Sequence, residues 1–220
     1  MKRKIFIYAY PIYEYASIFL FDDDYLKEKG RENPFKVLNE CIEKRYREKG
    51  YEIVYILYPD KDLYGIEEKN GDKIIYTDVR FTDASGYKED GSEKDISEII
   101  YPNLHYIYNQ IVLNNIDNIV VGGYHFSDCV RKIAEFAHEN NISSLVDLDL
   151  TDLFFTMYHR QDYFKVDGYD PTRYAKERLS EFYDWELKEF LDDFIELYKS
   201  PVYGISKEKC YELRKQILQH

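Results

Sequence analysis

The sequence predicts a three-layer α/β/α sandwich with a mostly parallel sheet and a helical C-terminal extension. Through about residue 155, short apolar runs alternate with longer amphipathic segments, which is the pattern of a parallel sheet covered by helices on both faces. Beyond Leu153 the strand-like runs stop and helical spacing takes over. We therefore expect an α/β domain over residues 1–155 and a helical extension over residues 156–220 that packs on the same domain.

The expected strands are short, predominantly apolar runs, as strands buried on both faces of a sheet require. They are Lys4–Tyr10, Tyr51–Tyr58, Asn118–Val121 and Ser144–Leu150, with a short addition at Lys73–Tyr76. The segment 60–91 around this short strand is polar and spaced by glycines. We expect an irregular excursion there, of the kind that forms active-site lids or interface arms.

Helices are expected where apolar residues recur every three or four positions between capping signals. The segments are Asn33–Gly50, Pro102–Asn115, Ser127–Asn140, Asp170–Lys199 and a last short helix that starts at Ser206. In the first of them asparagine is a good cap, and the proline after it suits the first helical position. Ser200 and Pro201 break the long C-terminal helix.

One stretch, Ile116 to Arg131, combines a strand, two glycines and a helix start, which is where α/β folds place their chemistry. Cys129 lies in the first turn of the expected helix, where backbone N–H groups and the helix dipole lower the pKa of a thiol. The same N–H groups can stabilise the oxyanion of an acyl-transfer intermediate. Cys129 is therefore a candidate nucleophile. The alternative is a small buried helix residue, because free cysteines are among the most buried side chains.

The same stretch resembles the core motif of the isochorismatase-like cysteine hydrolases, a family that includes nicotinamidases and N-carbamoylsarcosine amidase. The resemblance covers residues 116–152, and its elements are an apolar strand, a glycine, a short loop with a serine, and Cys-Val in a helix with an alanine-spaced face. The matching residues are Ile116, Asp117, Val120, Val121, Gly123, Ser127, Cys129, Val130, Arg131, Ala134 and Ala137. The resemblance implies a hydrolase that cleaves an amide or other C–N bond of a small molecule through a Cys, Lys and Asp triad.

Carried onto this sequence, the triad gives Cys129 as the nucleophile and Lys94 as the nearest lysine before the helix at Pro102. The family places its aspartate at the end of the first strand, where this chain has Tyr8–Tyr10, and Glu14 is the only carboxylate nearby. The resemblance thus implies catalytic roles for Cys129, Lys94 and Glu14 and substrate binding by Gly123, Tyr124, His125 and Ser127. The absent aspartate leaves open a non-catalytic, isochorismatase-like binding or structural protein.

Acidic residues at the same edge leave a metal-dependent hydrolase open as a further alternative. His125 follows one expected strand, and Asp147, Asp149 and Asp152 lie at the end of the next. Adjacent parallel strands would bring these groups together, and carboxylate oxygens can hold Mg²⁺ or Mn²⁺. The arrangement partly resembles manganese-dependent ureohydrolases, although this chain lacks their aspartate before the histidine. Helix capping and a solvated edge are the simpler explanation of these carboxylates.

Composition narrows the expected partners. The net charge is −12 and no Lys/Arg cluster is free of acids, so neither nucleic acid nor an anionic membrane is an expected partner. We find no segment apolar enough to span a bilayer and no signal peptide, and three cysteines suggest reduced thiols in the cytoplasm. No nucleotide-binding glycine motif is present, so no cofactor is expected. The 24 tyrosines, the excursion and the amphipathic tail predict a homodimer or larger assembly.

Overall fold

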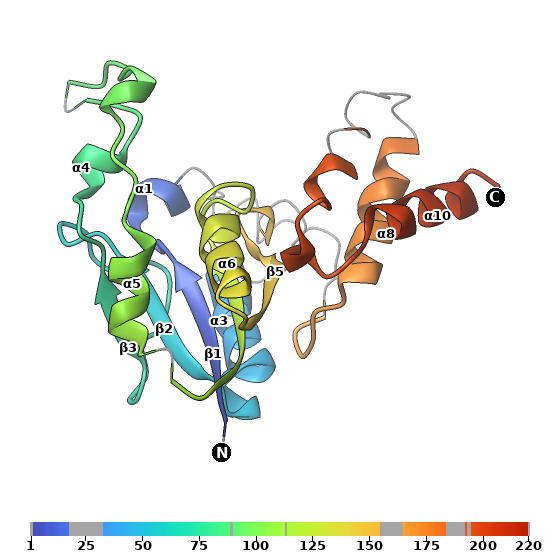
Figure 1. Cartoon of the computed structure of the whole chain (residues 1–220), viewed down its shortest axis with the longest axis horizontal. Coiled ribbons are helices and arrows are strands. Elements are labelled where there is room, and N and C mark those ends of the chain that lie inside the picture. The colour runs from blue at the N-terminus through green and yellow to red at the C-terminus, as the bar shows by residue number, and fades with distance from the viewer. Residues whose placement is uncertain are drawn as a thin grey trace.

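The computed structural model describes residues 2–17, 33–88, 90–112, 114–154, 165–183, 192 and 195–219. Its centre is a five-stranded parallel sheet in the order β3-β2-β1-β4-β5 (Figure 1). The strands are β1 (Arg3–Ala9), β2 (Glu52–Leu57), β3 (Lys73–Tyr76), β4 (Ile116–Gly123) and β5 (Ser143–Thr151). The predicted fold class is confirmed, and the four longer strands form because their apolar side chains are buried on both faces of the sheet, whereas Tyr76 of the edge strand β3 is exposed.

Helices cover both faces of this sheet. They are α1 (Tyr13–Ala16), α3 (Pro34–Arg45), α4 (Phe81–Ala84), α5 (Leu104–Ile111), α6 (Cys129–Glu139), α8 (Pro171–Tyr183) and α10 (Lys207–Ile217), with 3-10 turns η2 (Arg47–Lys49), η3 (Ile96–Glu98) and η4 (Pro201–Tyr203). On one face Leu38 of α3 packs in a cluster with Phe6 of β1. On the other face Ile107 of α5 and Ile133 of α6 share a cluster with Ile7 of β1. The result is the predicted three-layer arrangement.

The helix expected over residues 33–50 begins as predicted and ends earlier. Asn33 accepts a hydrogen bond from the backbone N–H of Phe35 at 2.9 Å, and proline occupies the first helical position. The helix stops at Arg45 because Tyr46 leaves helical geometry, with φ at −125°, and stacks on Phe6 with ring centroids 3.9 Å apart. A separate 3-10 turn then runs to Gly50.

The C-terminal segments share the core of the sheet. Tyr174 of α8, Val202 of η4 and Leu213 of α10 are buried in the same cluster as Val146 and Leu148 of β5. Figure 1 shows α8 and α10 side by side beyond β5. The predicted boundary at residues 155/156 lies outside the described residues, as do residues 184–191, 193 and 194 of the helix expected over 170–199. None of the helices in the described ranges is long and apolar enough to cross a membrane.

The chain order around β1 creates a crevice at one edge of the sheet. From the end of β1 the chain runs through α3 on one face to β2, and from the end of β4 it runs through α6 on the other face to β5. The connections at the carboxyl ends of β1 and β4 therefore run to opposite sides. Such a switch point is where open α/β sheets bind their ligands.

Candidate functional site

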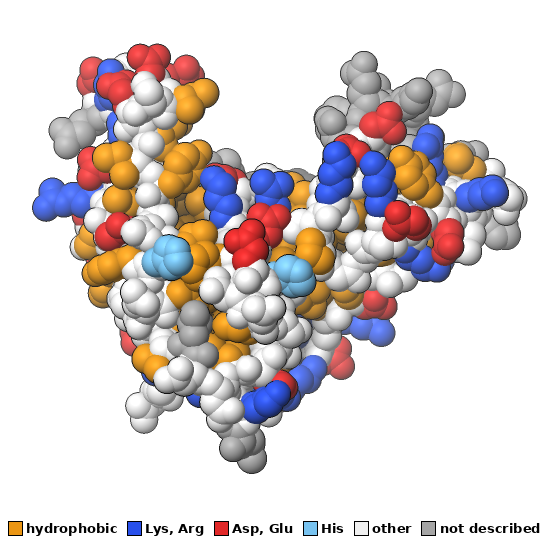
Figure 2. Space-filling model, viewed as in Figure 1, with side chains coloured by type: hydrophobic (Ala, Val, Ile, Leu, Met, Phe, Trp, Pro, Cys, Tyr) orange, Lys and Arg blue, Asp and Glu red, His pale blue; other side chains and the backbone are white. Residues whose placement is uncertain are grey.

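A cavity of about 630 Å³ opens at this carboxyl edge. Four parts of the chain line it: α1, the loop after β2, the loop between β4 and α6, and residues 81–102, which we call the arm. The charged or reactive side chains of the lining are Glu14, Lys61, Lys88, His125, Asp128 and Cys129. The arm projects from the body of the molecule, and Figure 2 shows hydrophobic side chains gathered along it and over α5. The cavity thus combines apolar walls with a few polar groups, as small-molecule sites do.

Gly123 sets the geometry of the loop that carries His125 and Cys129. Its φ is +106°, and a Cβ atom there would lie 2.1 Å from the carbonyl oxygen of Ala9 on β1. The next residue, Tyr124, donates its backbone N–H to the same oxygen at 3.0 Å, and the Tyr124–His125 peptide bond is cis. The ring of Tyr124 is buried edge-on against Tyr8. Gly123 and Tyr124, predicted to bind substrate, therefore form the support behind the cavity and do not line it.

Cys129 is the first residue of α6 and lines the cavity, as the sequence predicted for a nucleophile. Its Sγ lies 3.8 Å from Oδ2 of Asp128, whose Oδ1 pairs with Nζ of Lys132 at 2.6 Å. Burial, followed by the charge of Asp128, raises the pKa of the Cys129 thiol to about 12. The expectation of a lowered thiol pKa is therefore wrong, because burial and an adjacent carboxylate outweigh the helix N-terminus. Ser127 is exposed outside the cavity lining.

Glu14 and Lys61 form an ion pair within the cavity lining. Glu14 comes from α1, directly after β1, and Lys61 comes from the loop after β2. The Lys61 ammonium also lies over the ring of Phe81, 4.6 Å from its centroid. Sequence spacing missed Lys61, although the loop that follows each parallel strand is the place where such residues are expected.

Lys94 occupies a different place. Its Nζ donates to the carbonyl oxygens of Thr82 and Asp83, so it ties two parts of the arm together. Lys94 is not among the residues that line the cavity. The structure thus brings Cys129 and Glu14 to one cavity with Lys61, and it does not bring Lys94 there.

His125 and Asp152 form a second polar pair at the cavity. Nδ1 of His125 lies 3.3 Å from Oδ2 of Asp152, and Oδ1 of Asp152 accepts the backbone N–H of Phe126 at 2.8 Å. The His125 ring is also contacted by Tyr15, with ring centroids 4.9 Å apart in an edge arrangement. Asp152 therefore both caps the loop and orients the imidazole.

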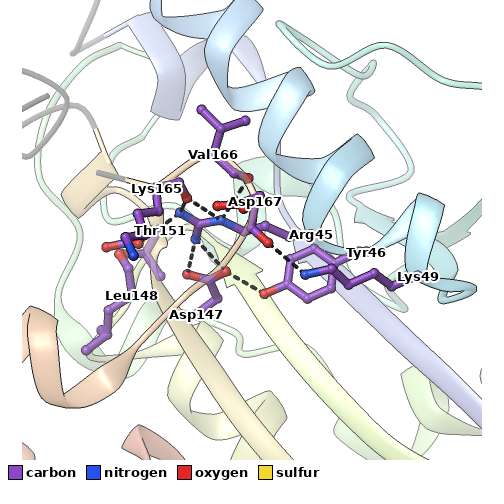
Figure 3. Close-up of polar contacts among 10 residues, drawn as sticks. Arg45, Tyr46, Lys49, Asp147, Leu148, Thr151, Lys165, Val166 and Asp167 are labelled. Atoms are coloured by element: carbon purple, nitrogen blue, oxygen red, sulfur yellow. Dashed lines mark hydrogen bonds and ion pairs between the residues drawn. The ribbon is translucent and has the colours of Figure 1, made fainter. Parts of the chain in front are cut away.

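Asp147 and Asp149 are engaged elsewhere, as Figure 3 shows for the network around Asp147. Both carboxylates bind the guanidinium of Arg45 at the end of α3: Nη1 lies 3.0 Å from Oδ2 of Asp147, and Nη2 lies 3.0 Å from Oδ2 of Asp149. Tyr46 donates its hydroxyl to Asp147 as well. Within the described ranges, no group of three or more His, Cys, Asp or Glu side chains could hold a metal. The metal site suggested for His125, Asp147, Asp149 and Asp152 is therefore wrong, because the first two aspartates face α3.

The reactivity of Cys129 should respond in opposite directions to the two charges beside it. Asp128 raises the pKa of the thiol and Lys132 lowers it. We expect Asp128→Asn to be alkylated by iodoacetamide about threefold to tenfold faster than wild type at about pH 8, because more thiolate is present. Lys132→Met should be slower than wild type. Both variants break the same ion pair, so peptide mapping that finds equal rates would contradict this electrostatic control.

In comparisons with known proteins, no family model and no curated protein matches the chain. Among solved structures it is similar to a proposed Mar1 ribonuclease from Leishmania major, with 14% identity over 74% of this chain and 75% of that chain and a TM-score of 0.42. It is also similar to a proposed isochorismatase hydrolase from Oleispira antarctica, with 12% identity over 68% and 75% of the two chains and a TM-score of 0.37.

A third similar structure is an isochorismatase-like hydrolase from Alkaliphilus metalliredigens, with 14% identity over 75% of this chain and 95% of that chain and a TM-score of 0.41. Similarities of this size leave the chemistry to be argued from the side chains around the cavity. By their descriptions, two of the three structures belong to the group that residues 116–152 resemble.

Proposed function

We propose that the protein is a hydrolase that uses Cys129 to cleave an amide or other C–N bond of a small molecule. The observation that carries the proposal is that Cys129, at the start of α6, lines one cavity together with the Glu14–Lys61 ion pair and His125. A nucleophile, charged groups and a proton carrier within one apolar cavity are the parts that acyl transfer requires.

The reaction would proceed in two halves. In the first, the sulfur of Cys129 attacks the carbonyl carbon, its proton is removed, and the C–N bond breaks as the nitrogen is protonated and leaves as an amine or ammonia. In the second, water attacks the thioester and releases the acid and the free thiol. Lys61 offers a positive charge and Glu14 a negative charge for the polar end of a substrate.

A non-catalytic binding protein is the second candidate. The raised pKa of Cys129 favours it, because at neutral pH the sulfur carries its proton and is a weak nucleophile. In that case the cavity would hold its ligand without a covalent step, and replacing the sulfur would leave ligand binding unchanged.

The test uses p-nitrophenyl acetate as an acylating probe and a panel of primary carboxamides assayed for ammonia. We expect wild type to release p-nitrophenolate and Cys129→Ser to lose at least about 100-fold in rate, since the hydroxyl is a far weaker nucleophile. The matched control is Cys210→Ala, which removes a buried thiol that does not line the cavity. Equal rates for wild type and Cys129→Ser would rule out the hydrolase and leave the binding protein.

A further inference from the structure

We propose that His125, oriented by Asp152, carries the proton between the Cys129 thiol and the leaving nitrogen. This assignment rests on the proposed hydrolase function and gives the site a Cys, His and Asp arrangement. His125 and Cys129 line the same cavity, and the turn between them is short: the backbone N–H groups of Asp128 and Val130 both donate to the carbonyl oxygen of His125 at 3.2 Å. The imidazole therefore lies on the loop that leads directly into the nucleophile.

The carboxylates of the cavity are poorly suited to move this proton. Glu14 is ion-paired with Lys61, and Asp128 is ion-paired with Lys132. Each of these carboxylates is thus already engaged by an ammonium group. His125 differs, because within the described part of the chain only its Nδ1 has a hydrogen-bonding partner and Nε2 is left for proton exchange. Imidazole is also the side chain suited to taking up and releasing protons near neutral pH.

Asp152 fixes the imidazole in the form that this role needs. With a carboxylate oxygen beside Nδ1, the proton of the neutral ring resides on Nδ1, and Nε2 becomes the acceptor. Asp152 is itself held by the backbone N–H of Phe126, and the carbonyl oxygen of Phe126 accepts the Tyr203 hydroxyl at 2.9 Å. The ring of Tyr15 packs edge-on against the imidazole of His125. These contacts join the loop to Asp152 directly after β5, to η4 and to α1.

The proton path balances in both halves of the reaction. Nε2 of His125 accepts the thiol proton as sulfur bonds to the carbonyl carbon, and it returns that proton to the nitrogen as the C–N bond breaks. In the second half Nε2 accepts a proton from the attacking water, and the thiol regains it when the thioester C–S bond breaks. No oxidant, metal or additional reactant is needed.

The test follows p-nitrophenolate release from p-nitrophenyl acetate between about pH 5 and pH 9, where imidazole changes charge. Wild type should lose rate on the acid side of this range. His125→Gln and His125→Asn should lose that acid limb and fall about 10²- to 10⁴-fold in rate, the range for a general acid–base residue. The matched control is His105→Gln, which changes an exposed histidine on α5 that contacts Phe136 edge-on outside the cavity lining.

Asp152 is a positioning residue, and its variants separate orientation from loop structure. Asp152→Asn should slow acylation by a smaller factor than His125→Gln and keep an acid limb, and Asp152→Glu should restore part of the rate. Thermal melts of each variant check that the fold is intact. If Cys129→Ser is inactive but both folded His125 variants match wild type in rate and pH profile, the proton role is wrong and the hydrolase stands. If wild type and Cys129→Ser are equally slow, the hydrolase proposal fails as well.

Discussion

Replacing Arg45 by methionine is expected to lower the free energy of unfolding by about 3–5 kcal/mol, because two carboxylates lose their buried partner. Asp147 and Asp149 are themselves buried, and each binds the guanidinium at 3.0 Å. Burial opposes the charge of Arg45, but the two aspartates more than offset this and raise the pKa of its guanidinium above the ordinary value. Methionine fills a similar volume, so the loss comes mainly from the uncompensated negative charge.

Arg45 also holds a distant segment in place. Its Nε donates to the carbonyl oxygen of Lys165 at 3.0 Å, and Lys49 donates to the carbonyl oxygen of Asp167 at 2.7 Å (Figure 3). Loss of the guanidinium should therefore loosen residues 165–167 from α3. Hydrogen exchange of these backbone amides in Arg45→Met would report this loosening separately from global unfolding.

The control for Arg45→Met lies one residue away on the same helix. Lys44 makes an exposed ion pair with Glu40 at 2.9 Å, and exposed pairs of this kind contribute little. Lys44→Met should leave urea unfolding nearly unchanged. The triple variant Arg45→Met, Asp147→Asn, Asp149→Asn should recover part of the lost stability, because it removes the buried charges. A loss below about 1 kcal/mol in Arg45→Met would contradict the proposed cost of the two carboxylates.

The strands and helix starts could be predicted from the sequence because their signals are local. Lys73–Tyr76 forms β3 with the predicted bounds, and Asn33 caps α3. Apolar runs and capping residues act within a few positions, so one sequence is enough to find them. The order of the strands depends on pairings between residues far apart in the chain, and no local pattern encodes it.

The metal-ligand role predicted for Asp147 and Asp149 is wrong because it rests on their position along the strand and not on the face of the strand to which they point. Both alternate with buried apolar residues of β5, so both point to the layer formed by α3. Arg45 lies four positions after Cys41 on the buried stripe of that helix. An arginine on the apolar stripe of a helix, together with aspartates that alternate with apolar residues in a strand, is a pattern that favours an internal ion pair.

The part of the candidate site that depends on local signals could be predicted from the sequence. Cys129 and His125 lie on one continuous loop after β4, and the local spacing placed both at the carboxyl edge. Lys61 reaches the cavity from a different connection, after β2. Choosing between Lys61 and Lys94 required knowing how the arm folds, which depends on contacts between Lys94 and the carbonyl groups of α4.

Replacing Gly123 by alanine is expected to cost about 3 kcal/mol or more of unfolding free energy, from a steric clash added to backbone strain. A Cβ atom at this position would lie 2.1 Å from the carbonyl oxygen and 2.5 Å from the nitrogen of Ala9, so β1 and β4 would have to separate. These two residues are the last pair between β1 and β4, two strands that are each flanked by neighbours on both sides. The loss should appear as a lower midpoint in urea unfolding.

Gly50→Ala separates the two causes of this loss. Gly50 also has a positive φ, at +76°, but a Cβ atom there would meet nothing within 4 Å. Its substitution should cost only the backbone strain, about 1–2 kcal/mol. If the two variants lose equal stability, the close approach of β1 and β4 contributes nothing. If Gly123→Ala loses more stability than Gly50→Ala, it should also slow acylation of Cys129. The reason is that His125 lies two residues beyond the point where the strands are forced apart.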